Sequence, residues 1–145
     1  MTHSIEVQKS LQTINNEVMK AESSIWSYRL SGDTSFLHPS LQERNQVIEN
    51  QYRHLRKITA GSPVQQASLD TLYTFLQKKC SLLHQSVTWN FGRDGKYPLI
   101  KGALYNDSIN RKIAGMNLRE NHLLAAHSNR FLFLSNNFII PILVL

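Results

Sequence analysis

The chain has 145 residues, of which 41% are hydrophobic and 18% are charged, so it is too apolar to be intrinsically disordered. A domain of this size can fold without metals or disulfides, and the single cysteine, Cys80, excludes an internal disulfide. The formal net charge of +6 permits contact with phosphate or an anionic membrane but does not require it.

The first predicted element is a long helix over residues 4–31. Apolar or amphipathic residues recur along it at alternating steps of four and three, which is the pattern of a helix with one buried seam. No proline or glycine interrupts the stretch, and Gly32 and Asp33 provide a C-terminal stop. The seam positions are Val7, Leu11, Ile14, Val18, Ala21, Ile25 and Tyr28.

Two further helices are predicted in the middle of the chain. One begins at Pro39 or Ser40 and ends at Thr59, and the next begins at Pro63 and runs to about Asn90, because proline suits the first turn of a helix. Their seams are Leu41, Ile48, Tyr52, Leu55 and Ile58 in the first, and Leu69, Leu72, Leu76, Leu83 and Val87 in the second.

A glycine-containing loop is predicted over residues 92–98, after which the helical period resumes at Leu99. This fourth helix has its seam at Ile109, Ile113, Met116, Glu120, Leu123 and His127. No stretch alternates as a strand would. The sequence therefore predicts an all-α fold, an antiparallel four-helix bundle with long helices.

The C-terminal segment, residues 131–145, is apolar and carries no charge. It is shorter than the roughly 20 residues that a helix needs to cross a bilayer core, so we expect the start of a truncated transmembrane helix. The predicted domain organisation is a four-helix bundle over residues 1–130, followed by this incomplete membrane segment over residues 131–145.

The sequence carries no nucleophile-elbow, nucleotide-binding or metalloprotease motif, so we expect no catalytic residue, no cofactor and no metal. Cys80 and His84 lie one helical turn apart, but the chain has no second cysteine, and we interpret them as a buried thiol beside a surface histidine. The basic run over residues 53–57 is interpreted as a solvated helix face, because the other basic residues are spread along the chain.

Two glutamates stand out by their positions. Glu120 occupies a seam position, where a carboxylate costs energy unless a cation or a donor faces it. Glu22 follows the seam residue Ala21 and is expected to be partly buried. Both fit either a structural polar contact inside a bundle or the lining of a ligand site, and the sequence leaves these alternatives open.

Residues 22–33, ESSIWSYRLSGD, resemble the E-T-G-x-R-G-Y-L-L-T-G-D signature of the CHASE domain of type three, a cyclases/histidine kinases associated sensory extracellular domain. Three other stretches agree in order: the opening His3-Ser4 with Val7, residues 63–72, and residues 109–127. The similarity spans residues 3–130. The signature residues, interpreted as structural while the ligand-binding residues stay unknown, are His3, Glu22, Tyr28, Leu30, Gly32, Asp33, Ile109, Ile113, Met116, Glu120, Leu123 and Leu124.

The chain departs from the signature at two arginine positions, where it has Trp26 and His127. If these arginines oppose the buried glutamates in the family, the glutamates need other partners here. Arg29 and Arg119 are the candidate substitutes.

The resemblance implies an extracytoplasmic bundle held between two membrane helices and reporting to a cytoplasmic output such as a histidine kinase. The chain would then be the periplasmic input domain of a membrane-bound receptor, a fragment without the first membrane helix and the output domain, where any kinase or cyclase activity would belong. Expected partners are a second copy of the chain, the membrane at the C-terminal segment, and an unknown small-molecule or protein stimulus, with no nucleic acid. The alternative is a stand-alone, membrane-tethered helical bundle acting as a binding or adaptor protein.

Overall fold

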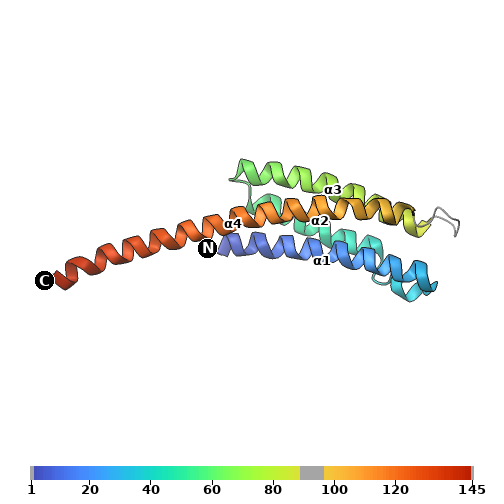
Figure 1. Cartoon of the computed structure of the whole chain (residues 1–145), viewed down its shortest axis with the longest axis horizontal. Coiled ribbons are helices and arrows are strands. Elements are labelled where there is room, and N and C mark those ends of the chain that lie inside the picture. The colour runs from blue at the N-terminus through green and yellow to red at the C-terminus, as the bar shows by residue number, and fades with distance from the viewer. Residues whose placement is uncertain (1, 89–96, 145) are drawn as a thin grey trace.

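The computed structural model describes residues 2–88 and 97–144, with side chains over residues 3–88 and 98–130. Its elements are α1 (Thr2–Ser31), the short 3-10 helix η1 (Thr34–Leu37), α2 (Leu41–Ile58), α3 (Pro63–Thr88) and α4 (Tyr97–Val144). Successive long helices run in opposite directions, and α4 continues past the N-terminal end of α1 (Figure 1). The part of the chain that the structure describes contains no strand. The predicted all-α four-helix bundle is confirmed.

Local capping explains where the helices begin and end. Gly32 has a positive φ of 74°, and its N–H donates to the Tyr28 carbonyl at 2.7 Å, which closes the last turn of α1. The Asp33 carboxylate then accepts a hydrogen bond from the Ser35 N–H at 2.9 Å and caps η1, which the sequence had left as a turn. Ser40 caps α2 by accepting from the Glu43 N–H at 3.1 Å, so Pro39 lies outside the helix.

The third and fourth helices differ slightly from expectation. Helix α3 begins at Pro63 as predicted, but its predicted end at Asn90 lies outside the described residues, as does most of the loop expected at 92–98. Helix α4 begins at Tyr97, so Pro98 belongs to the helix rather than to the loop. A proline is tolerated there because the first helical N–H groups have no partner within the helix.

The seam of α1 forms one side of the core as predicted. Its six aliphatic positions from Val7 to Ile25 are at most 3% exposed, and Tyr28 is half-buried. The core has two apolar parts. The larger comprises Val7, Leu11, Ile14, Val18, Ile48, Leu55, Leu69, Leu72, Leu76, Ile109, Ile113 and Met116, and the smaller comprises Ala21, Ile25, Leu83 and Leu99.

The buried seam of α4 is shorter than predicted. Leu123 is 48% exposed and His127 is also exposed, whereas Glu120 is buried. Figure 1 shows that α4 projects beyond the N-terminal end of α1, and a helix that leaves its neighbours loses the packing that buries a seam.

Within the part of the chain that is described, no helix contains an apolar stretch long enough to cross a membrane. The side chains of residues 131–145 lie outside that description. The truncated transmembrane helix therefore stays a prediction.

Candidate functional site

A charged layer separates the two apolar parts of the core. Lys79 of α3 is 0% exposed, and its ammonium forms an ion pair with Glu22 of α1. The same ammonium donates to the Gly102 carbonyl of α4 at 3.1 Å, and the Asn106 amide donates to both Glu22 carboxylate oxygens at 3.3 Å. This set of Glu22, Lys79, Gly102 and Asn106, here called the Lys79 layer, joins three helices through polar contacts.

The electrostatics of Lys79 follow from its position. Burial lowers the pKa of Lys79 to about 8, because desolvation penalises the charged form. Contact with the Glu22 carboxylate opposes this effect by favouring the ammonium. The layer thus holds a cation that costs free energy to bury, and the Glu22 carboxylate and the Gly102 carbonyl compensate part of that cost.

A second polar layer lies at the other end of the larger apolar part. The Glu120 side chain is 2% exposed, and its Oε1 accepts a hydrogen bond from the Gln65 amide of α3 at 2.8 Å. The same amide is 3.3 Å from the Met116 carbonyl. The other carboxylate oxygen, Oε2, is buried and has no hydrogen-bond partner within the described part of the chain. We call this pair the Glu120 layer.

The ion pair that Glu22 forms and the hydrogen bond that Glu120 accepts involve residues that the sequence analysis did not suggest as partners. The cation that contacts Glu22 is Lys79, which the sequence analysis did not single out. Glu120 is bonded to the Gln65 amide, and Arg119, one of the two suggested substitutes, is exposed. One signal was available: Lys79 lies three residues after Leu76 and four before Leu83, on the seam of α3.

The remaining signature residues divide between core, helix ends and surface. Ile109, Ile113 and Met116 lie in the larger apolar part of the core, and Gly32 and Asp33 form the turn between α1 and η1. Tyr28 and Leu124 are half-buried, whereas His3, Leu30 and Leu123 are exposed. The structure therefore brings Glu22 and Glu120 to separate layers rather than to one site.

The residues considered for metal or nucleic-acid binding do not form a common site, and some of them contact other side chains of the bundle. Cys80 is half-buried, burial raises the pKa of its thiol to about 11, and His84 is exposed. No group of three metal-ligating side chains forms among the described residues. In the basic run, Arg56 is paired with Asp70 and donates to Gln66 Oε1 at 2.6 Å. This guanidinium therefore already has partners within the chain.

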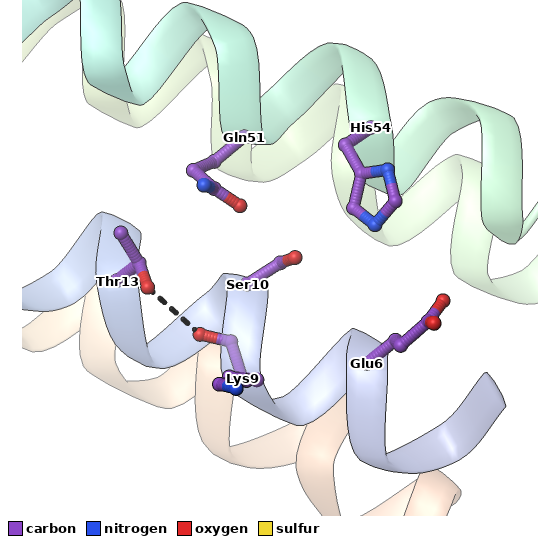
Figure 2. Close-up of a pocket in the computed structure, with 6 residues that line it drawn as sticks. All are labelled: Glu6, Lys9, Ser10, Thr13, Gln51 and His54. Carbon is purple, nitrogen blue, oxygen red and sulfur yellow. Dashed lines mark hydrogen bonds between the residues drawn. The ribbon is translucent and has the colours of Figure 1, made fainter. Parts of the chain in front are cut away.

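A polar groove of about 300 Å³ lies between α1 and α2. Figure 2 shows Glu6, Ser10 and Thr13 on α1, with Gln51 and His54 facing them from α2. The Thr13 hydroxyl donates to the Lys9 carbonyl at 3.0 Å (Figure 2). The groove offers charges of both signs and is bounded by only two helices, so it has the character of a hydrated surface depression.

These features define a helical bundle whose core is divided by polar layers and whose last helix projects beyond the rest. The family model of the CHASE3 domain matches residues 1–130. The chain therefore belongs to the CHASE3 family, a family of extracellular sensory domains of signalling proteins. Neither the curated proteins nor the solved structures include a match to the chain.

Proposed function

We propose that the chain is the periplasmic signal-input domain of a membrane-bound receptor such as a sensor histidine kinase, and that it is a fragment of that receptor. The observation that carries the proposal, besides family membership, is the placement of the helix ends. The N-terminal end of α1 and the projecting part of α4 lie at the same end of the bundle (Figure 1). A bundle held between two membrane helices needs this arrangement.

The proposed mechanism is a small displacement of α4 relative to α1. Helix α4 runs from Tyr97 to Val144 as one element, so a shift in the bundle moves its projecting part as well. Polar contacts join α1 to α4 at two levels of the described bundle: Asn106 donates to Glu22, and Gln8 donates to Asn121 at 2.6 Å and to the Asn117 carbonyl at 3.4 Å. A stimulus that favours one packing of these contacts would bias the receptor between two states. We assign no catalysis to this chain, and any kinase or cyclase activity would belong to other domains.

Reporter fusions made in the gene at its natural locus test the placement. Alkaline phosphatase joined after Asn129 should be active and green fluorescent protein joined at the same residue should be dark, because the first folds only outside the cytoplasm and the second only within it. A bright fluorescent fusion with an inactive phosphatase would overturn the receptor proposal and favour the alternative, a stand-alone, membrane-tethered helical bundle acting as a binding or adaptor protein.

We further propose a homodimer formed through the outward face of α4. Three aliphatic side chains on this face are more than half exposed: Ile100 at 56%, Leu104 at 74% and Leu118 at 56%. Beside Leu118, around Gly115, lies a hollow of about 310 Å³ that a side chain of a second copy could fill. In a Cys80→Ser background, Leu104→Cys should cross-link between copies, whereas Thr71→Cys on the exposed face of α3 should not. Equal cross-linking of both would overturn this interface.

A further inference from the structure

A small cavity of about 220 Å³ lies beneath η1, at the end of the bundle opposite the projecting part of α4 (Figure 1). Four elements bound it: α1, η1, the start of α2 and the last turns of α3. Most of its wall is apolar, with Ile25 from α1, Phe36 and Leu37 from η1, and Val87 from α3. It is thus enclosed by more elements than the polar groove of Figure 2, which lies between two helices.

One charged side chain, Arg44 of α2, lines this apolar cavity. It is 11% exposed, and its Nη1 lies 3.3 Å from Glu17 Oε2. Its Nε is buried and has no hydrogen-bond partner among the residues that the structure describes. A buried guanidinium N–H without an acceptor costs free energy, so the single contact with Glu17 leaves part of the donor capacity of Arg44 unused.

Charges of both signs lie around the cavity, but the cation is the one that lines it. The Glu17 carboxylate pairs with Arg44 and also with Lys20, whose Nζ lies 3.8 Å from Glu17 Oε1. Two further acidic groups, Glu43 in the first turn of α2 and Asp33 at the cap of η1, are exposed and are not among the lining residues. Ser40 and the N-terminal end of α2 also line the cavity, and a helix N-terminus carries partial positive charge.

We propose that this cavity binds a small organic carboxylate with a compact apolar body. The apolar part would fill the space between Ile25, Phe36 and Val87, and the carboxylate would accept hydrogen bonds from Arg44. Drug-sized ligands occupy clefts of about 300–1,000 Å³, so a ligand here has on the order of ten non-hydrogen atoms or fewer. Phosphate and sulfate lack the apolar part that most of the wall requires.

The cavity is placed to influence the Lys79 layer. Two of its lining residues, Ala21 and Ile25, flank Glu22 on α1, and Glu22 contacts both Lys79 and Asn106. A ligand that shifts this turn of α1 would therefore change the contact between α1 and α4. This signalling role rests on the proposed function, but the binding itself does not, so the fusion experiment and the binding experiment fail independently.

The test is calorimetric titration of the full chain, in detergent micelles, with benzoate and with benzamide as its neutral counterpart. Micelles alone provide the blank for partitioning. Benzoate should bind saturably and at least roughly tenfold more tightly than benzamide, because only the carboxylate engages the guanidinium. Binding no tighter than that of benzamide, or no saturable benzoate binding at millimolar concentrations, would overturn the proposal.

Three variants locate the binding. Arg44→Gln should weaken benzoate binding roughly tenfold, whereas Lys20→Gln, the matched control next to Glu17 but outside the cavity wall, should change it by less than about twofold. Ser24→Leu should abolish binding by filling the cavity from α1 while keeping every charge. Circular dichroism checks the fold of each variant. If Arg44→Gln does not fold, Ser24→Leu decides, and undiminished binding to Ser24→Leu would place benzoate elsewhere and overturn the site.

Discussion

The two polar layers accommodate a glutamate in the bundle in different ways. Both place a family-signature glutamate near apolar core residues, yet Glu22 meets a fully buried cation and Glu120 meets a neutral amide. The Lys79 layer has polar contacts from three helices, whereas one oxygen of Glu120 has no partner among the described residues. Removing one member of a buried ion pair leaves the other charge uncompensated, whereas neutralising a carboxylate that pairs with no described cation leaves none behind. Substitution should therefore destabilise the Lys79 layer more than the Glu120 layer.

The largest expected effect is that of Lys79→Met. This change leaves the Glu22 carboxylate, whose side chain is 17% exposed, without its cation. Breaking a buried pair by removing one partner costs about 3–5 kcal/mol, and because Glu22 keeps some solvent contact we expect about 3 kcal/mol. The measurement is urea unfolding of the full chain in micelles, followed by circular dichroism.

The matched control for this change is Lys79→Met combined with Glu22→Leu. Replacing both charges by apolar groups of similar volume removes the uncompensated carboxylate, so most of the lost stability should return. A double variant that is no more stable than Lys79→Met would show that the two residues do not stabilise the bundle as a pair.

The next largest effect is the difference between Glu22→Gln and Glu120→Gln. The first leaves the buried Lys79 ammonium without its counter-charge and should destabilise the bundle by about 2 kcal/mol. The second removes a buried charge that faces no cation and keeps the Oε1 position as an acceptor for Gln65, so its effect should be within about 1 kcal/mol of zero. Equal destabilisation by the two variants would erase the distinction between the layers.

Much of this architecture could be predicted from sequence, because it depends on periodicity. The buried seam of α1 could be predicted from the alternating steps of four and three, and the first residue of α3 could be predicted from Pro63. Lys79 was missed because the seam of α3 was assigned by apolar residues alone, although a lysine stands on it. Its partner lies on another helix, and no local pattern encodes that pairing.

The seam predicted for α4 is longer than the buried one, again because a local pattern does not encode contacts with other helices. Leu123 and His127 continue the period of Glu120, but burial depends on whether neighbouring helices are still present at that height of the bundle. Figure 1 shows that the last part of α4 extends beyond the other helices. The cavity beneath η1 was likewise not predictable, because it is assembled from four elements and from a 3-10 helix that the sequence showed only as a turn.

Measuring the free energy of unfolding against pH tests the Lys79 layer separately from the Glu120 layer. The pKa of Lys79 is lowered from 10.5 to about 8 in the folded chain, so between these values the unfolded state binds more protons and stability rises with pH. Above pH 9 the raised pKa of Cys80 acts in the opposite direction, which leaves pH 8 to 9 as the clearest window. The slope there should be positive and below the limit of about 1.4 kcal/mol per pH unit for one proton.

The control for the titration is again Lys79→Met. Subtracting its stability from that of the unchanged chain at each pH cancels the contributions of the other titrating groups. The difference in stability should grow from pH 8 to pH 9. A difference that stays constant over this interval would mean that the folded-state pKa of Lys79 is not lowered into it.

The smallest expected effect is at Gln8, which lies on α1 opposite Asn121, the neighbour of Glu120. Its amide donates to Asn121 Oδ1 at 2.6 Å, but this contact is exposed, so water can replace it in Gln8→Ala. We expect a loss of about 0.5 kcal/mol, and a coupling with Asn121→Ala of less than about 1 kcal/mol in a double-mutant cycle. The corresponding cycle for Lys79 and Glu22 should give several times more, because neither water nor another side chain can substitute for a partner at a buried ammonium. If the two cycles gave equal couplings, burial would not be what distinguishes the Lys79 layer, and its role in joining α1, α3 and α4 would have to rest on geometry alone.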